Sequence, residues 1–102
     1  MAPWSKVLSQ SLQELRVHLC QTSPASKGIR EFLIGNYTEM KKANPDFPIL
    51  VRECSGAEAK LVARYDFGVE KSVSIQDLDS GAVAAKLQEL IKAGEGLPRS
   101  GE

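Results

Sequence analysis

The spacing of hydrophobic positions divides the chain into strands and helices. From residue 15 to residue 20 apolar and polar residues alternate, which is the period-2 pattern of a half-buried strand. The next apolar positions recur every three or four residues and predict a helix that Ser23 caps, Pro24 begins and Asn44-Pro45 ends. The apolar positions of the strand are Leu15, Val17 and Leu19, and those of the helix are Ile29, Phe32, Leu33, Tyr37 and Met40.

The second half of the chain predicts three more strands and a second helix. Residues 48–51 form a continuous apolar run, as in a strand of a parallel sheet. Residues 61–67 and 71–75 alternate again, and Gly68 between them supports a tight turn, so these two strands should form a hairpin. The last helix begins at Asp79 or Ser80 and ends at Gly94. Its apolar face consists of Val83, Leu87, Leu90 and Ile91.

The order β-α-β-β-β-α, with a parallel pair of strands followed by a hairpin, predicts the fold class. It is α/β and thioredoxin-like, with a four-stranded mixed sheet and two main helices. We expect one domain at residues 14–93, an N-terminal extension at residues 1–13 and a disordered tail at residues 94–102. The extension carries Trp4, Val7, Leu8 and Leu12 at helical spacing. It is either a weak mitochondrial targeting segment or a terminus with some packing residues.

Composition narrows the functional classes by exclusion. The 102 residues include 13 basic and 13 acidic side chains, so the chain lacks the basic excess of a dedicated nucleic-acid-binding protein. No apolar run approaches the ~18 residues that span a bilayer. Two cysteines do not make a disulfide-rich secreted scaffold.

Cys20 lies where a thioredoxin carries its C-x-x-C pair, after a strand and before a helix. A thiol in this position feels the positive end of the helix dipole, which favours thiolate chemistry. Here the motif reads Cys20-Gln21-Thr22-Ser23, so Ser23 replaces the resolving cysteine. The proline that thioredoxins place before the third core strand is also missing, since residues 57–60 read AEAK. A monothiol redox enzyme is therefore a rival hypothesis and not the leading one.

The other candidate residues favour structural roles. His18 has no second histidine or carboxylate at metal-ligand spacing. Asp66-Phe67-Gly68 matches a kinase magnesium motif, but the glycine-rich loop and the catalytic loop of a kinase are missing. Glu53 and Asp66 are conceivable acid–base partners, but nothing else in the sequence converges on them. We therefore predict no catalytic, cofactor-binding or metal-binding residue.

Four segments of the chain carry a family resemblance. They read LRVHLCQTSP, GIREF, KKANPDFPILVREC and ARYDFGVE, and the resemblance extends from about Leu15 to Leu90. The chain resembles the small thioredoxin-like accessory subunits of mitochondrial respiratory complex I, whose domain family also includes some mitochondrial ribosomal proteins. The paired cysteines and the neutral charge fit the complex I members better than the ribosomal members, which are typically basic.

The resemblance implies a non-catalytic subunit without a cofactor of its own, supporting assembly or stability. Such a subunit lies at the mitochondrial inner membrane, peripheral and on the matrix side. Its partners are other complex I subunits, above all the large iron–sulfur subunit of the matrix arm, with no nucleic acid and no membrane span. The first rival is a mitochondrial ribosomal protein of the same domain family, and the second is the monothiol redox protein.

Cys20 and Cys54 follow the two strands of the βαβ unit, which should be neighbours in the sheet. Adjacent strands lie roughly 4.8 Å apart, inside the ~4.4–6.8 Å that separates the Cα atoms of a disulfide. We predict that the two cysteines lie within disulfide reach. Two buried free thiols are the alternative.

Strand parity predicts an arginine-rich outer face of the sheet. If the leucines of the first strand face the helices, alternate residues face away from them. We predict that Arg16, Arg52 and Arg64 on this outer face bind an acidic patch of a partner, with phosphate as the lesser alternative ligand. The alternatives are that they pair with Glu53 or Asp66, or that Trp4 and Leu8 cover the face. The other outward positions are His18, Cys20, Leu50, Cys54, Val62 and Asp66, and the inward ones are Ile49, Val51, Leu61, Ala63, Tyr65 and Phe67.

Overall fold

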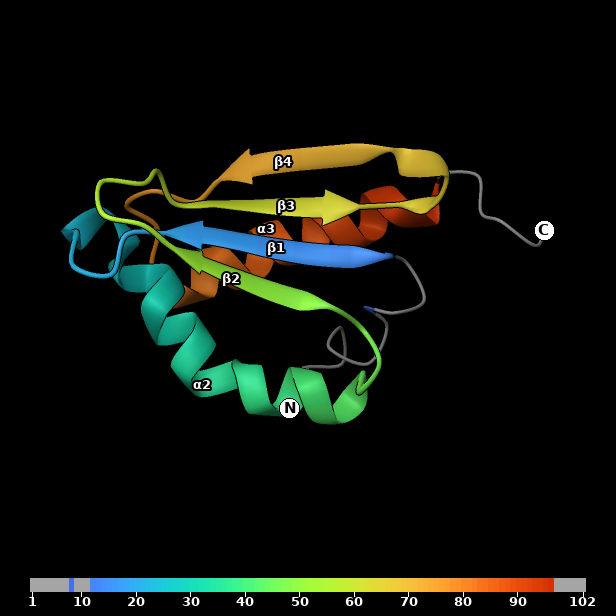
Figure 1. Cartoon of the computed structure of the whole chain (residues 1–102), viewed down its shortest axis with the longest axis horizontal. Coiled ribbons are helices and arrows are strands. Elements are labelled where there is room, and N and C mark those ends of the chain that lie inside the picture. The colour runs from blue at the N-terminus through green and yellow to red at the C-terminus, as the bar shows by residue number, and fades with distance from the viewer. Residues whose placement is uncertain (1–7, 9–11, 97–102) are drawn as a thin grey trace.

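The computed structural model of the chain describes residue 8 and residues 12–96. Within them the element order is β-α-β-β-β-α, as predicted, and the α/β class with its four-stranded mixed sheet is confirmed (Figure 1). Short 3-10 turns, η2 (Pro24–Ser26) and η3 (Asp66–Gly68), precede the first helix and the last strand. The main elements are β1 (Glu14–Leu19), α2 (Lys27–Ala43), β2 (Ile49–Glu53), β3 (Lys60–Arg64), β4 (Glu70–Ser74) and α3 (Ser80–Glu95).

The strands lie in the order β2-β1-β3-β4, so β1 is an interior strand and β2 and β4 are the edges. β1 runs parallel to β2 and antiparallel to β3, and β3 runs antiparallel to β4. This register aligns His18 with Arg52 on one side and with Lys60 on the other. Because aligned residues point to the same face of a sheet, it fixes which side chains share each face.

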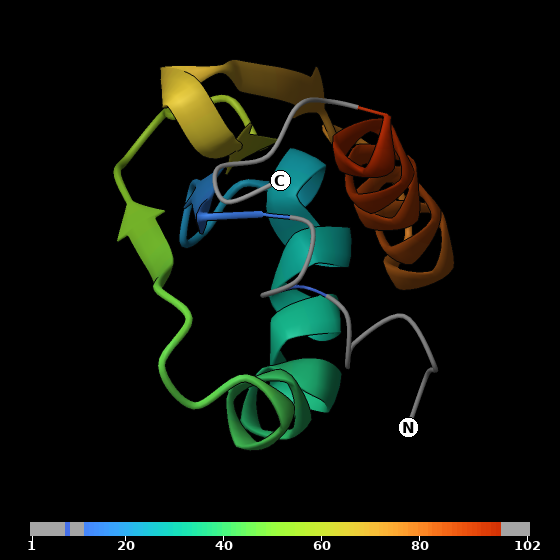
Figure 2. The same cartoon turned by 90° about the vertical axis from the view of Figure 1, so that its right-hand side faces the viewer.

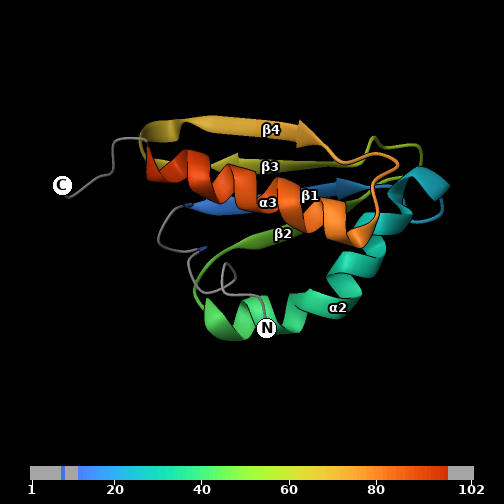
Figure 3. The same ribbon diagram turned by 180° about the vertical axis from the view of Figure 1, so that it is seen from behind.

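Both helices cover the same face of the sheet. In Figure 1 the strands stand in front of α3, and Figure 3 shows the same helix in front of the strands from behind. Figure 2, from the side, shows α2 and α3 together on one side. The hydrophobic core lies between the sheet and these two helices. It includes Leu15, Val17 and Leu19, as predicted. Among the described residues no helix covers the opposite face, which we call the open face. None of these helices has the length and apolar character that crossing a membrane requires.

Capping residues set the helix ends. The Ser23 hydroxyl accepts a hydrogen bond from the Ala25 N–H at 3.2 Å, but it caps the η2 turn, and α2 begins only at Lys27. Buried Asn44 ends α2, and its side-chain amide donates to the Met40 carbonyl at 2.9 Å. Of the two predicted caps of α3, Asp79 is the one used, since its carboxylate accepts from the Ala82 N–H at 2.8 Å. The helix continues past Gly94 to Glu95.

Gly28 marks the closest approach between α2 and the loop that leads into α3. A Cβ atom on Gly28 would lie 1.7 Å from the Leu78 carbonyl oxygen, far inside any real contact. A hydrogen bond from the Asp77 N–H to the Ala25 carbonyl, at 2.9 Å, ties the same loop to the start of the helix. Only glycine therefore allows this packing.

The N-terminal extension contributes to the core. Leu8 and Leu12 are 0% and 3% exposed and belong to the same buried cluster as the sheet leucines. The alternative in which Leu8 covers the open face is therefore wrong, because its side chain packs among the core residues. Trp4 and Val7 lie outside the described residues, as do residues 97–102 of the predicted disordered tail.

Two side chains predicted to face inward are exposed. Val51 is 36% exposed because β2 is an edge strand, so its inward side is only partly covered. Phe67 is 71% exposed because β3 already ends at Arg64, and Phe67 lies in η3 with a positive φ of 63°. Conversely, Val62 on the open face is only 8% exposed, and its register partner there is Arg16. The long stem of an arginine can cover such a residue.

Candidate functional site

Cys20 lies in a turn directly after β1 and is 3% exposed. Its sulfur accepts a hydrogen bond from the Gly56 N–H at 3.4 Å, and the Thr22 hydroxyl lies 3.7 Å away. Gly56 belongs to the loop between β2 and β3, where thioredoxins carry their proline. In this protein a backbone N–H from that loop reaches the thiol instead.

These hydrogen bonds favour the thiolate form of Cys20. The backbone N–H of Thr22 makes the largest contribution and that of Gly56 the second, and together with the Thr22 hydroxyl and the Ser23 N–H they lower the pKa of Cys20 to about 7. Desolvation acts in the opposite direction and is weaker. A substantial fraction of Cys20 is therefore ionised at neutral pH.

The first turn of the helical region holds the Cys20 backbone in place. The Ser26 hydroxyl accepts from the Cys20 N–H at 3.0 Å. The Arg30 guanidinium donates to the carbonyl oxygens of Cys20 and Ser23, each at 2.8 Å. Ser23 supplies a cap at the position where a resolving cysteine would stand, so the turn has no second thiol there.

Cys20 and Cys54 directly follow the last paired residues of the two parallel strands. Register pairs Leu19 with Glu53, and the Cys54 N–H donates to the Leu19 carbonyl at 3.1 Å. Both are free thiols in the structure, Cys20 buried and Cys54 exposed, so the predicted bridge is not formed in it. The disulfide stays a prediction, and the alternative of two buried thiols does not describe the exposed Cys54.

The three predicted arginines share the open face, but their surroundings differ. Arg16 is ion-paired, with Nη2 at 2.7 Å from the Glu70 carboxylate and Nε at 3.5 Å from that of Glu14. In the part of the chain that the structure describes, Arg52 and Arg64 make no ion pair. The alternative pairing with Glu53 or Asp66 is therefore not seen, and for Arg16 the partner carboxylates are different ones.

His18 stands at the centre of a basic cluster on the open face. Partial burial lowers the pKa of His18, and the positive charges of Lys60, Arg16 and Arg52 lower it further. Lys60 was not among the predicted site residues. Its place beside His18 follows from the antiparallel register of β1 and β3, which the alternation of either strand alone does not reveal.

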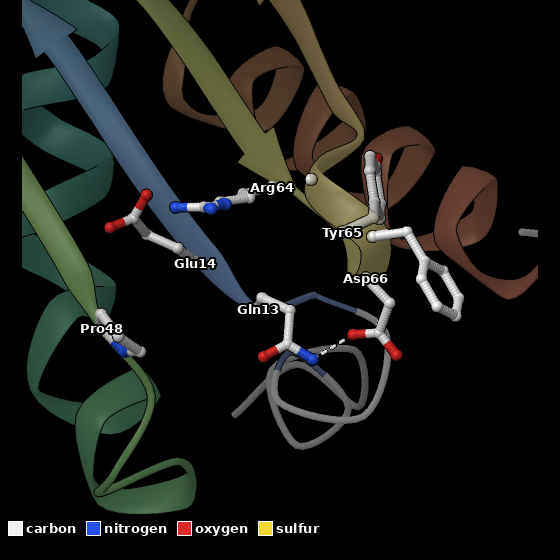
Figure 4. A pocket seen from close by; sticks show the side chains of 8 residues that line it. Gln13, Glu14, Pro48, Arg64, Tyr65 and Asp66 are labelled. Carbon is white, nitrogen blue, oxygen red and sulfur yellow. Dashed lines mark hydrogen bonds between the residues drawn. The ribbon is translucent and has the colours of Figure 1, made fainter. Parts of the chain in front are cut away.

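A groove of about 440 Å³ lies at the far end of the sheet, where β1 begins and β3 ends (Figure 4). The Gln13 amide donates to the Asp66 carboxylate there, and Arg64 extends over β1 toward Glu14. Glu53 lies at the other end of the sheet, paired with Leu19, so Glu53 and Asp66 are not acid–base partners. Among residues 8 and 12–96 no three His, Cys, Asp or Glu side chains are grouped to hold a metal ion.

Comparison with known proteins gives one family. Residues 29–80 match the family described as the mitochondrial ribosomal protein L51 / S25 / CI-B8 domain. The chain is 51% identical over 80 residues, 78% of its length, to NADH dehydrogenase [ubiquinone] 1 alpha subcomplex subunit 2 of Mus musculus, covering 81% of that protein. Against the protein of the same name in Arabidopsis thaliana the identity is 45%, with 89% of this chain and 94% of the relative covered. The large ribosomal subunit protein mL43 of Mus musculus is 27% identical over 79% of this chain and 44% of its own length.

Proposed function

Because the chain belongs to the mitochondrial ribosomal protein L51 / S25 / CI-B8 family, we propose that it is a non-catalytic accessory subunit of mitochondrial respiratory complex I. The observation that carries this proposal is its similarity, over most of both chains, to animal and plant proteins named as subunits of that enzyme. A fungal relative from Neurospora crassa, named NADH-ubiquinone oxidoreductase 10.5 kDa subunit, is 42% identical over 82% of this chain and 89% of its own. The weaker ribosomal similarity and the balanced charge favour complex I over the ribosome.

The thiol site supports a non-catalytic role. A dithiol cycle needs a second thiol to release the mixed disulfide, and the residue at that position, Ser23, is engaged as the cap of the η2 turn. Thioredoxin-type reduction of a disulfide substrate in the presence of glutathione is the test of the redox rival. Sustained turnover that disappears in Cys20→Ser would contradict the proposal.

We place the protein on the matrix side of the inner membrane, peripheral, and bound to the large iron–sulfur subunit through its open face. The feature that supports this placement is a sheet that, within residues 8 and 12–96, has helices on one side only and presents the exposed Arg52 and Arg64 on the other, with no ion pair to either among these residues. Exposed arginines recognise carboxylates with directional, paired hydrogen bonds.

Sedimentation tests the identity of the particle. The tagged full-length chain is expressed in mitochondria, which are solubilised in a mild detergent and separated on a density gradient. We expect the tag in the fractions that oxidise NADH. A tag that sediments with the large ribosomal subunit instead would show that the proposed function is wrong.

Charge reversal tests the docking face. The double variant R52E/R64E should incorporate into the complex several-fold less well, because two attractive contacts become repulsive. The control is K42E/K92E, which changes the net charge equally on exposed helix positions away from the open face. Lys41 is unsuitable as a control because its ammonium donates to the Phe47 carbonyl at 2.8 Å and so supports the end of α2. Equal loss of incorporation in both double variants would exclude this face.

A further inference from the structure

The basic side chains of the open face gather at one end of the sheet. His18 on β1 is aligned with Arg52 on β2 and with Lys60 on β3, so the three form a continuous row across three adjacent strands. Side chains at aligned positions have Cβ atoms roughly 4.5–5.5 Å apart. We call these three residues the basic row. Among the described residues no carboxylate forms an ion pair with any of them.

The other end of the open face is balanced by acidic side chains. Arg16 is held by Glu14 and Glu70, as described above. Arg64 is aligned with Glu14 on one neighbouring strand and with Glu70 on the other. The surplus positive charge therefore lies at the basic row, even though the chain as a whole is neutral.

A groove lies beside the basic row, and two residues of the row, His18 and Lys60, line it. Its volume is about 440 Å³, and its floor contains the nearly buried Val62. Arg16, His18, Lys60, Glu70, Lys71 and Ser72 complete its lining. An extended segment placed there would meet mainly basic side chains, with Val62 as the one apolar residue and Glu70 as the one acidic residue of the lining.

We propose that Arg52, His18 and Lys60 receive the side-chain carboxylates of an acidic segment of a partner protein, and that docking is coupled to protonation of His18. This inference rests on the proposed function, since it names the chemistry of the partner at the docking face. A protein segment fits better than nucleic acid because the four strands carry no phenylalanine, tyrosine or tryptophan on which a base could stack.

The proton coupling follows from the charges around the imidazole. His18 faces Arg16 on its own strand, Arg52 on β2 and Lys60 on β3, and these cations disfavour the imidazolium. Glu70 on β4 is engaged with Arg16, and Cys20, the next residue of this face on β1, is covered by the loop that carries Gly56. An incoming carboxylate reverses the local field, so it raises the pKa of His18 and docking takes up a proton.

The single histidine of the chain makes this measurable by NMR. The probe is hexaglutamate, titrated into the full-length protein while the His18 ring signals are followed between pH 5 and pH 8. We expect the chemical shifts of the ring to saturate with added peptide and the pKa of His18 to rise in its presence. The peptide should also bind more tightly near pH 5 than near pH 8. Reading the ring itself separates this proton from that of Cys20, whose pKa is about 7.

Variants matched in net charge test whether the basic row is the part of the surface that binds hexaglutamate. R52E/K60E should bind hexaglutamate roughly tenfold more weakly, whereas K42E/K92E, with the same net charge, should bind as the wild type does. His18→Gln should bind with an affinity that no longer rises as the pH falls. Ring signals that do not move, or equal loss in both double variants, would overturn the proposal. Tighter binding of an oligouridylate of matched charge than of hexaglutamate would overturn it in favour of nucleic acid.

The gradient experiment distinguishes a failure of the basic row as the docking site from a failure of the proposed function. In the gradient experiment R52E/K60E should lose at least several-fold of its incorporation, and K42E/K92E should not. If the wild type does not sediment with the NADH-oxidising fractions, the proposed function is wrong. The peptide titration then still tests whether the basic row binds carboxylates. If the wild type does so and R52E/K60E matches it, the function stands and the basic row is not where the partner binds.

Discussion

Tyr65 links the sheet to the last helix through one buried hydrogen bond. Its hydroxyl donates to the Leu90 carbonyl at 2.7 Å, and the ring is 2% exposed. Tyr65→Phe keeps the ring and removes the bond, so we expect the free energy of unfolding to fall by about 1 kcal/mol. For a domain of this size that corresponds to a melting temperature lower by roughly 4–8 °C.

The matched control for this prediction is Tyr37→Phe on α2. Tyr37 is 37% exposed, so loss of its hydroxyl should change the melting temperature by much less. Urea unfolding of both variants beside the wild type measures the two effects. A Tyr65→Phe protein as stable as the Tyr37→Phe protein would show that the Leu90 contact does not stabilise the fold.

At the same scale, Cys20 predicts a pH dependence of stability. Its pKa is about 7 in the folded protein, below the ordinary thiol value of 9.0, because backbone N–H groups of Thr22 and Gly56 stabilise the thiolate. The folded state therefore releases this proton at lower pH than the unfolded chain does. The resulting stabilisation is fully present above pH ~9 and is lost as the pH falls through about 7.

Denaturation under reducing conditions at pH 6 and pH 9 tests this linkage. The stability difference between the wild type and Cys20→Ser should be larger at pH 9, since serine has no such proton to release. If the difference is the same at both pH values, the N–H groups around the sulfur do not lower its pKa. Cys20→Ala, which also lacks the ionisable group, should show the same trend.

At the scale of elements, the contact between α2 and the loop before α3 depends on one glycine. Gly28→Ala would place a methyl group against the Leu78 backbone, which cannot move without disturbing the start of α3. We expect a loss of about 2–3 kcal/mol in the free energy of unfolding. Gly35→Ala in the same helix is the control, since a Cβ there meets nothing within 4 Å. That change should stabilise the protein by roughly 0.5–1 kcal/mol, because alanine favours the helix. Opposite shifts of the two melting temperatures are the expected result, and similar shifts would contradict it.

The elements also show what the sequence could predict and what it could not. Alternation along β1 assigned Leu15, Val17 and Leu19 to the core, because an interior strand has one fully covered side. The same rule failed at Val51, where the strand lies at an edge, and at Phe67, where the strand has already ended. Periodicity describes one strand at a time and does not contain these tertiary limits.

The candidate site shows the same limit over longer distances. Parity placed Arg16, Arg52 and Arg64 on one face, and the structure agrees. Strand parity did not reveal that Glu70, far along the chain, pairs with Arg16, or that Lys60 lies beside His18. Both contacts follow from the register between strands. The sequence therefore predicted the face but not the position of its surplus charge.

At the scale of the whole molecule, the placement of both helices on one side of the sheet explains why one face is a buried core and the other is open. Two helices cover one side of the sheet, and two leucines of the N-terminal extension complete that core. The other side carries polar and charged residues, and among the described residues no second layer of helices covers it. A second layer from a partner protein is consistent with the low net charge of the chain and with its unevenly distributed cations.

The neighbouring thiols give the last prediction, which also concerns the whole chain because a bridge would close the loop from β1 to β2. Oxidised glutathione at alkaline pH should convert Cys20 and Cys54 to an intramolecular disulfide: the exposed Cys54 forms a mixed disulfide first, and the Cys20 thiolate then displaces the bound glutathione, so that one oxidised glutathione becomes two reduced molecules. In the chain-entropy model a loop of this length stabilises the fold by about 3–4 kcal/mol, so the melting temperature should rise by roughly 10 °C or more. Loss of the hydrogen bond from the Gly56 N–H to the Cys20 sulfur would reduce this gain. Intact mass and thiol labelling measure the bond, and Cys54→Ser is the control that can form only mixed or intermolecular disulfides. A wild-type protein that still labels at both cysteines after oxidation would show that the two thiols, although they follow the paired residues Leu19 and Glu53, cannot reach each other.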